Sequence, residues 1–294
     1  MEQRRLGRTG LKVTILGFGA MELRDANHPT DEQAERLLNT VLDAGINFID
    51  TSPDYGQSEY RIGKFISHRR DEYYLATKCG CNIPRDESDE TRHIWTRDML
   101  LHNIETSLRQ MKTDHIDIWQ LHNAGCEDVQ EGDLVRVMED VRQQGKVRHV
   151  SMSSTLPHLA SFIQEGAFDT YQIPYSALER HHEAIIGSAA EADAGTIIRG
   201  GVAKGEPEGD LSGHQNWEPW ELAGLDSLRE VGESRSAFLL RFTITHPHMH
   251  TTIVGTKSLE HLAENLRTVA VGPLALDVYR NAKQRLKQIG QVPA

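Results

Sequence analysis

Short apolar runs typical of buried strands alternate along the chain with segments of helical periodicity, and this alternation restricts the fold more than any other feature. The strand-like runs lie at Val13–Leu16, Ile46–Ile49, Tyr73–Thr77, Ile116–Leu121, Val147–Val150, Tyr171–Ile173, Thr196–Ile198 and Thr252–Val254. A strand followed by a helix, repeated eight times, predicts parallel strands joined by crossover helices. Eight such units within 294 residues suit a closed barrel. We therefore expect an α/β fold in which residues 1–294 form a single (β/α)8 TIM-barrel domain.

The two ends of the chain predict additions to this barrel. Gly7–Gly10 is rich in turn-forming residues and is flanked by Arg4–Leu6 and Lys12–Thr14, which predicts an N-terminal β-hairpin. An apolar stripe within Leu276–Ile289 predicts an extra C-terminal helix.

Charge and composition exclude several classes of function. The 43 Asp and Glu residues outnumber the 32 Lys and Arg residues, so the formal net charge is −11. A broad basic face for nucleic acid is therefore not expected, and no apolar run reaches the ~20 residues of a membrane span. An odd count of cysteines, at Cys79, Cys81 and Cys126, argues against a disulfide framework. We expect a cytoplasmic protein with a small-molecule substrate, and its oligomeric state stays open.

Polar side chains follow three neighbouring strands, at the barrel end where such enzymes keep their reactive groups. Asp50 comes directly after the second predicted strand, and Tyr55 follows it on the next turn. Lys78 follows the third strand and His122 the fourth. The sequence therefore predicts that these four side chains meet at one end of the barrel.

These four residue types suit the protonation of a carbonyl oxygen. A free tyrosine has a pKa of about 10, which is too high for an efficient acid at neutral pH. The ammonium of Lys78 would lower the pKa of Tyr55, and the Asp50 carboxylate would keep the lysine charged and in place. His122 would hold the carbonyl oxygen near the phenol. None of the four supplies an electron pair to reduce carbon, so we also expect a hydride cofactor.

The segments around these residues make the sequence recognisable, and it resembles the aldo-keto reductase family along nearly its whole length. Asn47–Gly56 is similar to the family signature around the catalytic Asp and Tyr, Ala76–Lys78 to the segment with the catalytic Lys, and Ile116–His122 to the segment with the His. Gly63 fits the family's small residue in the next helix. The resemblance implies NAD(P)(H)-dependent reduction of an aldehyde or ketone to an alcohol by hydride transfer, with Tyr55 as general acid.

The resemblance also implies which residues hold the cofactor. Segments after the fifth and sixth strands match those that bind the nicotinamide, the loop after the seventh matches the one around the pyrophosphate, and the segment after the eighth matches the adenosine end. The implied cofactor-binding residues are Gly19, Asp50, Ser153, Ser154, Gln172, Tyr175, Ile198, Arg199, Gly200, Lys204, Gly255, Thr256, Lys257, Ser258, His261, Glu264 and Asn265. Among them, Tyr175 is the aromatic residue that would stack on the nicotinamide ring.

The adenosine end favours NADP(H) and leaves NAD(H) possible. Lys257, Ser258 and the helix start beside them would take a 2′-phosphate. His261 stands where the family commonly has Arg or Gln, and a neutral His gives less to a phosphate than Arg would. Ser151 and Ser154 stand where Gly and Asn are usual in the family, which modifies carboxamide binding without excluding it.

Two other functions stay open at this point. A cofactor-binding regulatory or redox-sensing protein could use the same barrel with little turnover, and Cys79 and Cys81 beside Lys78 leave redox sensitivity open. Retention of all four catalytic residues argues against that function. A metal-dependent isomerase or hydrolase would need a cluster of carboxylates and histidines at the strand ends. We find only Asp50 and His122 there, so we expect no metal site.

Overall fold

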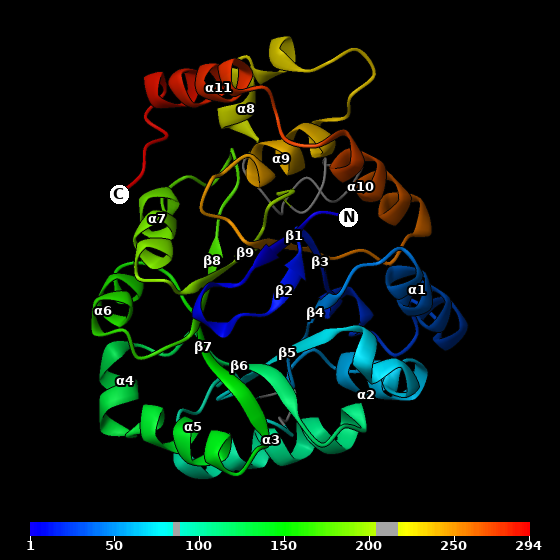
Figure 1. Ribbon diagram of the computed structural model, residues 1–294, viewed down its shortest axis with the longest axis vertical. Helices are drawn as coiled ribbons and strands as arrows, with labels where there is room; N and C mark the ends of the chain where they lie inside the picture. Colours follow the sequence, from blue (N-terminus) through cyan, green and yellow to red (C-terminus); the bar gives the residue numbers. More distant parts are fainter. Residues whose placement is uncertain (85–88, 204–216) are drawn as a thin grey trace.

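Parallel strands form a closed barrel at the centre of the molecule (Figure 1). The structure is a computed structural model that describes residues 1–84, 89–203 and 217–294. The barrel strands are β3 (Leu16–Gly19), β4 (Phe48–Asp50), β5 (Tyr74–Cys79), β6 (Ile116–His122), β7 (Val147–Ser153), β8 (Thr170–Pro174), β9 (Gly195–Arg199) and β10 (Thr251–Val254). They follow one another around the barrel in chain order, and β10 closes it by pairing with β3. The predicted (β/α)8 fold is confirmed.

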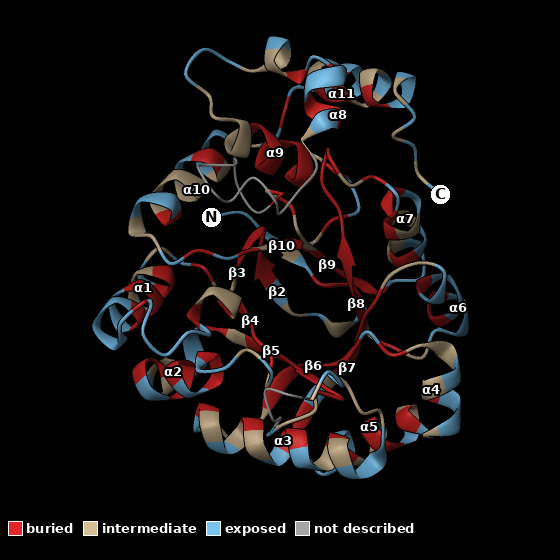
Figure 2. Cartoon of the chain, turned by 180° about the vertical axis from the view of Figure 1, so that it is seen from behind, coloured by how far each residue is buried: buried red, intermediate tan, exposed pale blue. Residues whose placement is uncertain are grey.

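Helices surround the barrel with their buried faces inward and their exposed faces outward (Figure 2). The α-helices are α1 (Asp31–Asp43), α2 (Ser58–Phe65), α3 (Arg97–Met111), α4 (Cys126–Glu131), α5 (Leu134–Gln143), α6 (His158–Glu165), α7 (Glu183–Glu191), α8 (Glu218–Leu222), α9 (Arg235–Ile244), α10 (Leu259–Val271) and α11 (Leu276–Gln288). Short 3-10 helices lie at Gly7–Thr9, Ala20–Leu23, Ser67–Glu72 and Leu225–Leu228. The predicted C-terminal helix is confirmed as α11. Among the described residues, no helix combines the length and the apolar character that a membrane crossing needs.

The start of α1 shows how the sequence sets a helix boundary. The Thr30 hydroxyl accepts the backbone N–H of Gln33, and the Gln33 side chain accepts the backbone N–H of Thr30. This reciprocal cap satisfies two N–H groups that the first turn of a helix leaves unpaired. Apolar residues recurring between Ala34 and Leu42 then place one face of α1 in the core.

The predicted strand Val13–Leu16 is divided between two elements. Its first two residues belong to β2 (Lys12–Thr14), which pairs antiparallel with β1 (Gln3–Arg5) as the predicted hairpin. Leu16 instead begins the barrel strand β3. The apolar run continues through the point where the chain leaves the hairpin and enters the barrel, so periodicity alone could not divide it.

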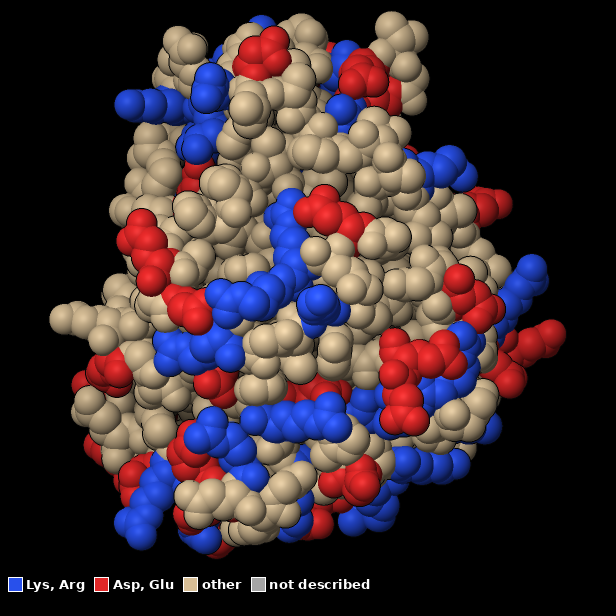
Figure 3. All heavy atoms as spheres, in the orientation of Figure 1, with Lys and Arg blue, Asp and Glu red and all other residues tan. Residues whose placement is uncertain are grey.

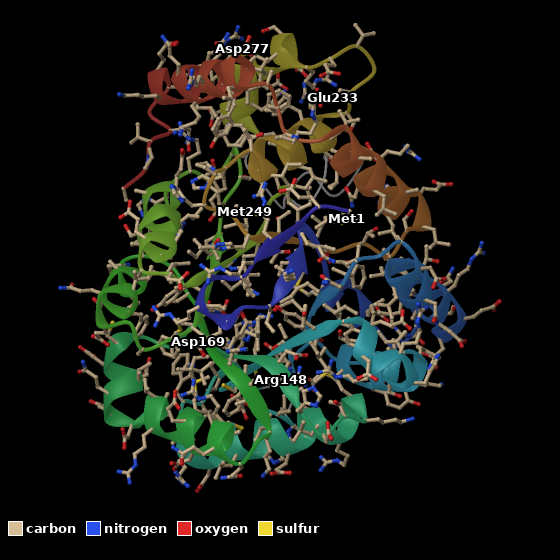
Figure 4. The ribbon with its side chains drawn as sticks, viewed as in Figure 1. Met1, Arg148, Asp169, Glu233, Met249 and Asp277 are labelled. Carbon is tan, nitrogen blue, oxygen red and sulfur yellow. The ribbon has the colours of Figure 1, made fainter. Side chains whose placement is uncertain are left out.

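The hairpin closes the N-terminal end of the barrel. Its apolar side chains pack on residues that point into the barrel from four strands, in a cluster of Leu6, Val13, Phe48, Ala76, Ile118 and Ile197. Arg4 donates to the backbone carbonyl of Met249, which Figure 4 labels beside the hairpin. Acidic and basic side chains are interspersed on this face (Figure 3). Because the hairpin covers the N-terminal end, a ligand of the barrel must enter at the opposite end, where the strands have their carboxyl ends.

Candidate active site

A buried ion pair between Asp50 and Lys78 forms the centre of the site. Asp50 is the last residue of β4, and Lys78 lies near the end of the neighbouring β5. Lys78 Nζ donates to Asp50 Oδ2 at 2.7 Å and to the backbone oxygen of Thr51 at 2.8 Å. Burial lowers the pKa of Lys78, but Asp50 and Tyr55 raise it by more, so the net pKa lies above its ordinary value. Lys78 is therefore a fixed positive charge at the mouth of the barrel.

Two buried amides hold the second carboxylate oxygen of Asp50. Gln120 Nε2 from β6 and Gln172 Nε2 from β8 donate to Asp50 Oδ1 at 2.7 Å and 2.8 Å. Ser153 lies opposite Gln172 in the strand register and donates to its Oε1 at 3.1 Å. Sequence reasoning missed Gln120. It lies two residues before His122, and strand alternation therefore puts both on one face of β6, which could have signalled it.

Tyr55 stands on the turn between β4 and α2, beside the lysine. Lys78 Nζ lies 4.9 Å from the centroid of the Tyr55 ring, and the centroids of the Tyr55 and His122 rings are 6.3 Å apart. Burial raises the pKa of Tyr55, Lys78 lowers it, and Asp50 and Asp54 raise it again, so the net pKa is above its ordinary value. The prediction of a lowered pKa is thus wrong for the net shift, because burial outweighs the lysine.

His122 ends β6 and is neutral at physiological pH. Its Nδ1 lies 3.3 Å from Cys81 Sγ, 3.5 Å from Ser52 Oγ and 3.8 Å from Asp54 Oδ1. Burial, and after it the charge of Lys78, lowers the pKa of His122 well below its ordinary value. Within the described part of the chain these contacts all engage Nδ1, which leaves Nε2 to face a substrate oxygen. The structure thus brings the four predicted catalytic side chains together at the end of three neighbouring strands.

A second buried carboxyl group, that of Glu59, lies behind the site and was not predicted. Thr77 Oγ1 and Ser107 Oγ donate to its Oε1 at 2.6 Å and 2.8 Å. Burial raises the pKa of Glu59 to about 7, although both hydroxyl groups act to lower it. Glu59 is on α2, shortly after Tyr55, and Thr77 directly precedes Lys78 on β5. The contact therefore joins the two elements that carry Tyr55 and Lys78, and no local spacing in the sequence marks it.

The residues predicted to hold a nicotinamide lie deep in the barrel mouth. Ser153, Ser154 and Gln172 are buried, and Gln172 contacts Asp50 directly. Among the described residues, nothing donates a hydrogen bond to the buried Oε1 of Gln120. Burying a hydrogen-bond acceptor that has no donor destabilises the fold, and an N–H group of a bound carboxamide would supply the missing donor. The amides and hydroxyls at this end therefore fit a nicotinamide.

The other predicted cofactor residues lie at the ends of β3, β9 and β10 and at the start of α10. Gly19 and Gly255 approach so closely that a Cβ on Gly255 would stand 2.8 Å from the Gly19 carbonyl oxygen. Ser258 caps α10 by accepting two backbone N–H groups of its first turn, and Lys257 and His261 beside it are exposed. Ile198 and Thr256 are buried, and Arg199, Gly200, Glu264 and Asn265 are half-buried. Lys204 lies outside the described residues. An exposed cationic end and a buried amide end suit the two halves of a dinucleotide.

Tyr175 does not present its ring as stacking would require. The side chain is fully buried, and its hydroxyl lies 3.1 Å from that of Tyr279 on α11. The ring packs against Phe242 and His246, with centroids 6.0 Å and 5.2 Å away. An enclosed ring has no free face for a nicotinamide, so in this structure Tyr175 is a packing residue. That Tyr175 stacks on the nicotinamide stays a prediction, and it requires the side chains packed against the ring to move away from one of its faces.

The chain matches known proteins in sequence and in structure. The model of the Aldo/keto reductase family matches residues 15–285. The uncharacterized oxidoreductase YqkF of Bacillus subtilis is 25% identical over 98% of this chain and 97% of its own length. L-galactose dehydrogenase of Arabidopsis thaliana is 24% identical over 92% of this chain and 88% of its own. The holo form of aldo-keto reductase AKR11C1 from Bacillus halodurans aligns with a TM-score of 0.85 at 26% identity, covering 97% of this chain and 96% of that one.

The family match covers both the barrel and all four residues predicted to be catalytic. It starts at Ile15, directly before β3, and ends within α11. Such a match shows more than a shared fold, because the same barrel serves many unrelated reactions. The protein belongs to the aldo/keto reductase family, whose members are oxidoreductases that act on small-molecule carbonyl compounds.

Proposed function

We propose that this protein reduces an aldehyde or a ketone to an alcohol with a nicotinamide cofactor, and that Tyr55 is the general acid. The observation that carries the proposal is the buried Asp50–Lys78 pair beside the Tyr55 ring, with the neutral His122 on the next strand. A fixed cation next to a buried phenol stabilises the phenolate that forms when the proton leaves. This arrangement supports proton donation to an oxygen at the barrel mouth.

The polar groups around Asp50 support the choice of cofactor. Ser153, Gln172 and Gln120 would hold the carboxamide, and Lys257 with the start of α10 would hold a phosphate at the other end. When bound, a nicotinamide supplies hydride to the carbonyl carbon or accepts it from the alcohol. The exposed Lys257 favours NADP(H), whereas His261, at a position where the family commonly has Arg or Gln, leaves the use of NAD(H) open.

Each catalytic side chain has one task in the proton transfer. Tyr55 gives its hydroxyl proton to the carbonyl oxygen, and Lys78 stabilises the phenolate that remains. Asp50 keeps Lys78 charged and in place, and the two amides on its second oxygen prevent it from turning away. His122 donates a hydrogen bond from Nε2 to the carbonyl oxygen and so holds it near Tyr55. In the reverse direction the phenolate takes the proton of the alcohol.

We also propose that the chain acts as one domain in the cytoplasm. The predicted site residues run from Gly19 to Asn265, so a domain boundary between them would divide the site. Cys79, Cys81 and Cys126 are all free thiols, which a reducing compartment would preserve.

A substrate panel tests the proposed function. Aldehydes, ketones, aldoses and sugar alcohols are each offered with NADP(H) and with NAD(H), and nicotinamide absorbance is followed. The similarity to an L-galactose dehydrogenase makes aldoses the first compounds to include. We expect turnover of at least one carbonyl compound, faster with NADPH than with NADH. Tight NADP(H) binding without turnover of any compound would instead indicate a cofactor-binding regulatory protein.

A further inference from the structure

Four potential metal ligands gather around the catalytic histidine. Asp54 lies on the turn after β4, Cys81 and His93 on the connection after β5, and His122 at the end of β6. Each offers one ligand atom, and these four atoms all lie within 4.8 Å of one another. Asp54 is exposed and His93 half-buried, so solvent can reach the cluster. Sequence reasoning missed it because the ligands come from three separate segments and no local spacing links them.

Two of the separations are close to those in a tetrahedral metal site, and no two of the four atoms are more than 4.8 Å apart. His122 Nδ1 lies 3.3 Å from Cys81 Sγ and 3.8 Å from Asp54 Oδ1. Zn²⁺ binds nitrogen, oxygen and sulfur at about 2.0–2.3 Å, which places tetrahedral ligand atoms about 3.3–3.8 Å apart. These atoms could therefore bind one ion with small shifts.

The surroundings hold these ligands in position. The backbone N–H of Cys81 donates to Asn103 Oδ1 and its carbonyl accepts from Asn103 Nδ2, both at 2.9 Å. The His93 ring stacks on Trp95 at 5.6 Å and meets the His122 ring edge-on at 4.6 Å between centroids. The Nε2 atom of His93 is sheltered from solvent and has no hydrogen-bond partner within the described residues. A sheltered ring nitrogen without a partner has a vacant bonding position that a ligand would fill.

We propose that Asp54, Cys81, His93 and His122 bind one thiophilic divalent cation of the Zn²⁺ type. A set of sulfur, nitrogen and oxygen donors suits Zn²⁺ and disfavours Mg²⁺ and Ca²⁺, which prefer oxygen alone. Binding releases the thiol proton of Cys81 to solvent, since the thiolate is the ligand.

Metal binding would also lower carbonyl reduction. The shift that brings His122 Nδ1 onto the ion also moves Nε2 on the other side of the ring, so Nε2 would no longer hold the carbonyl oxygen in line with Tyr55. This consequence rests on the proposed function, whereas the binding of the cation does not.

A cobalt titration of the metal-free full-length protein tests the site, since Co²⁺ is a coloured stand-in for Zn²⁺. We expect one equivalent to bind with the visible bands of a tetrahedral ion and a thiolate-to-cobalt charge-transfer band, and Zn²⁺ to displace it. Mg²⁺ should leave both signals unchanged. The absence of saturable Co²⁺ binding to the wild-type protein would overturn the proposal.

Three variants assign the ligands. Cys81→Ser should lose the charge-transfer band. Both Cys81→Ser and His93→Gln should bind Co²⁺ at least ~100-fold more weakly than the wild type. Even residues that only hydrogen-bond to a metal ligand contribute about 10- to 100-fold to metal affinity, and a direct ligand should contribute no less. Cys126→Ser removes a thiol outside the cluster and should bind as the wild type does. Thermal unfolding of each variant shows that it is folded. Persistence of the band in Cys81→Ser, or its loss in Cys126→Ser, would place the ion elsewhere.

A turnover assay separates the two proposals. One equivalent of Zn²⁺ should lower wild-type turnover, a chelator should restore it, and Cys81→Ser should keep its own metal-free rate when Zn²⁺ is added. Equal inhibition of both proteins would contradict the link between the site and His122. If no carbonyl compound is turned over, the proposed function fails, yet the cobalt spectra still decide the metal site.

Discussion

Glu59 is buried behind Tyr55 and Lys78, and burial raises the pKa of its carboxyl group from the ordinary 4.5 to about 7. A carboxyl group whose pKa is higher in the folded state stabilises the fold at low pH, and this contribution is lost as the pH rises from 4.5 to 7. The shift corresponds to about 3 kcal/mol at most. Glu59→Gln removes the titration and keeps an acceptor for Thr77 and Ser107. Relative to the wild type, we expect the free energy of unfolding of the variant to increase by about 2–3 kcal/mol between about pH 5 and about pH 8.

Urea unfolding of both proteins at the two pH values measures this difference. Equal pH dependence in the wild type and the variant would show that Glu59 is not the titrating group.

Lys257 is the residue on which the proposed preference for NADP(H) depends most. It is exposed at the start of α10, beside the Ser258 cap. Lys257→Met should raise the KM for NADPH by about 10- to 100-fold, since it removes one charge-assisted hydrogen bond to a phosphate. The KM for NADH should change little, because NADH lacks the 2′-phosphate. Steady-state kinetics with both cofactors checks this, and an equal rise in both KM values would place the lysine elsewhere on the cofactor.

Spacing along the chain was enough to predict that the four proposed catalytic side chains meet, but not which residues support them. Asp50, Lys78 and His122 each come at the end of a recognisable strand, so barrel geometry brings them together. Gln120 and Glu59 act through partners in distant elements, and only the folded structure reveals those partners. The sequence also identified Lys78 as a group that lowers the pKa of Tyr55, but it contained no measure of burial, which dominates the net shift.

At the scale of elements, the packing of α2 on α3 sets the position of Tyr55. Gly63 in α2 faces α3 so closely that a Cβ would stand 2.0 Å from the Gln110 carbonyl oxygen and 2.7 Å from the Met111 Cα. Gly63→Ala should therefore destabilise the protein by about 1–3 kcal/mol and lower turnover, because backbone cannot yield as a flexible side chain would. The helix would have to move, and the turn that carries Tyr55 moves with it.

Gly187→Ala is the matched control for this substitution. Gly187 is also inside a helix, but its nearest neighbour, the His248 ring, would be 3.9 Å from the new Cβ. Alanine there should stabilise α7 by about 0.5–1 kcal/mol. Thermal unfolding and turnover of the two variants compare the positions directly, and a Gly63→Ala protein as stable and active as Gly187→Ala would refute the packing argument.

Most strands were located from the sequence, but several ends were not. The predicted Val147–Val150 continues in the structure as far as Ser153. The apolar run ends because Ser151 and Ser153 are polar. Both serines are nevertheless buried, since they pair with Thr170 and Gln172 on the neighbouring strand. The strand residues closest to the site are the polar ones, so apolar periodicity stops just before the positions that matter for function.

At the scale of the whole molecule, stability and chemistry lie at opposite ends of the barrel. The fully buried Leu6 belongs to the hairpin that covers the N-terminal end, whereas the proposed catalytic side chains follow the carboxyl ends of the strands. Leu6→Ala should lower the free energy of unfolding by about 2–5 kcal/mol. The kcat of the folded variant should stay near the wild-type value. Denaturant unfolding and turnover together check this, and a kcat that falls in parallel with stability would contradict the separation.

The central claim is that Tyr55 donates the proton in a carbonyl reduction, and the Tyr55→Phe variant tests it most directly. This substitution removes one oxygen and leaves the ring beside Lys78. The measurement pairs kcat on the best carbonyl compound with the dissociation constant of NADP(H). We predict that kcat falls by about 10²- to 10⁴-fold, the usual contribution of a general acid, while the dissociation constant changes by less than about twofold. A Tyr55→Phe protein that turns over at the wild-type rate would contradict the mechanism.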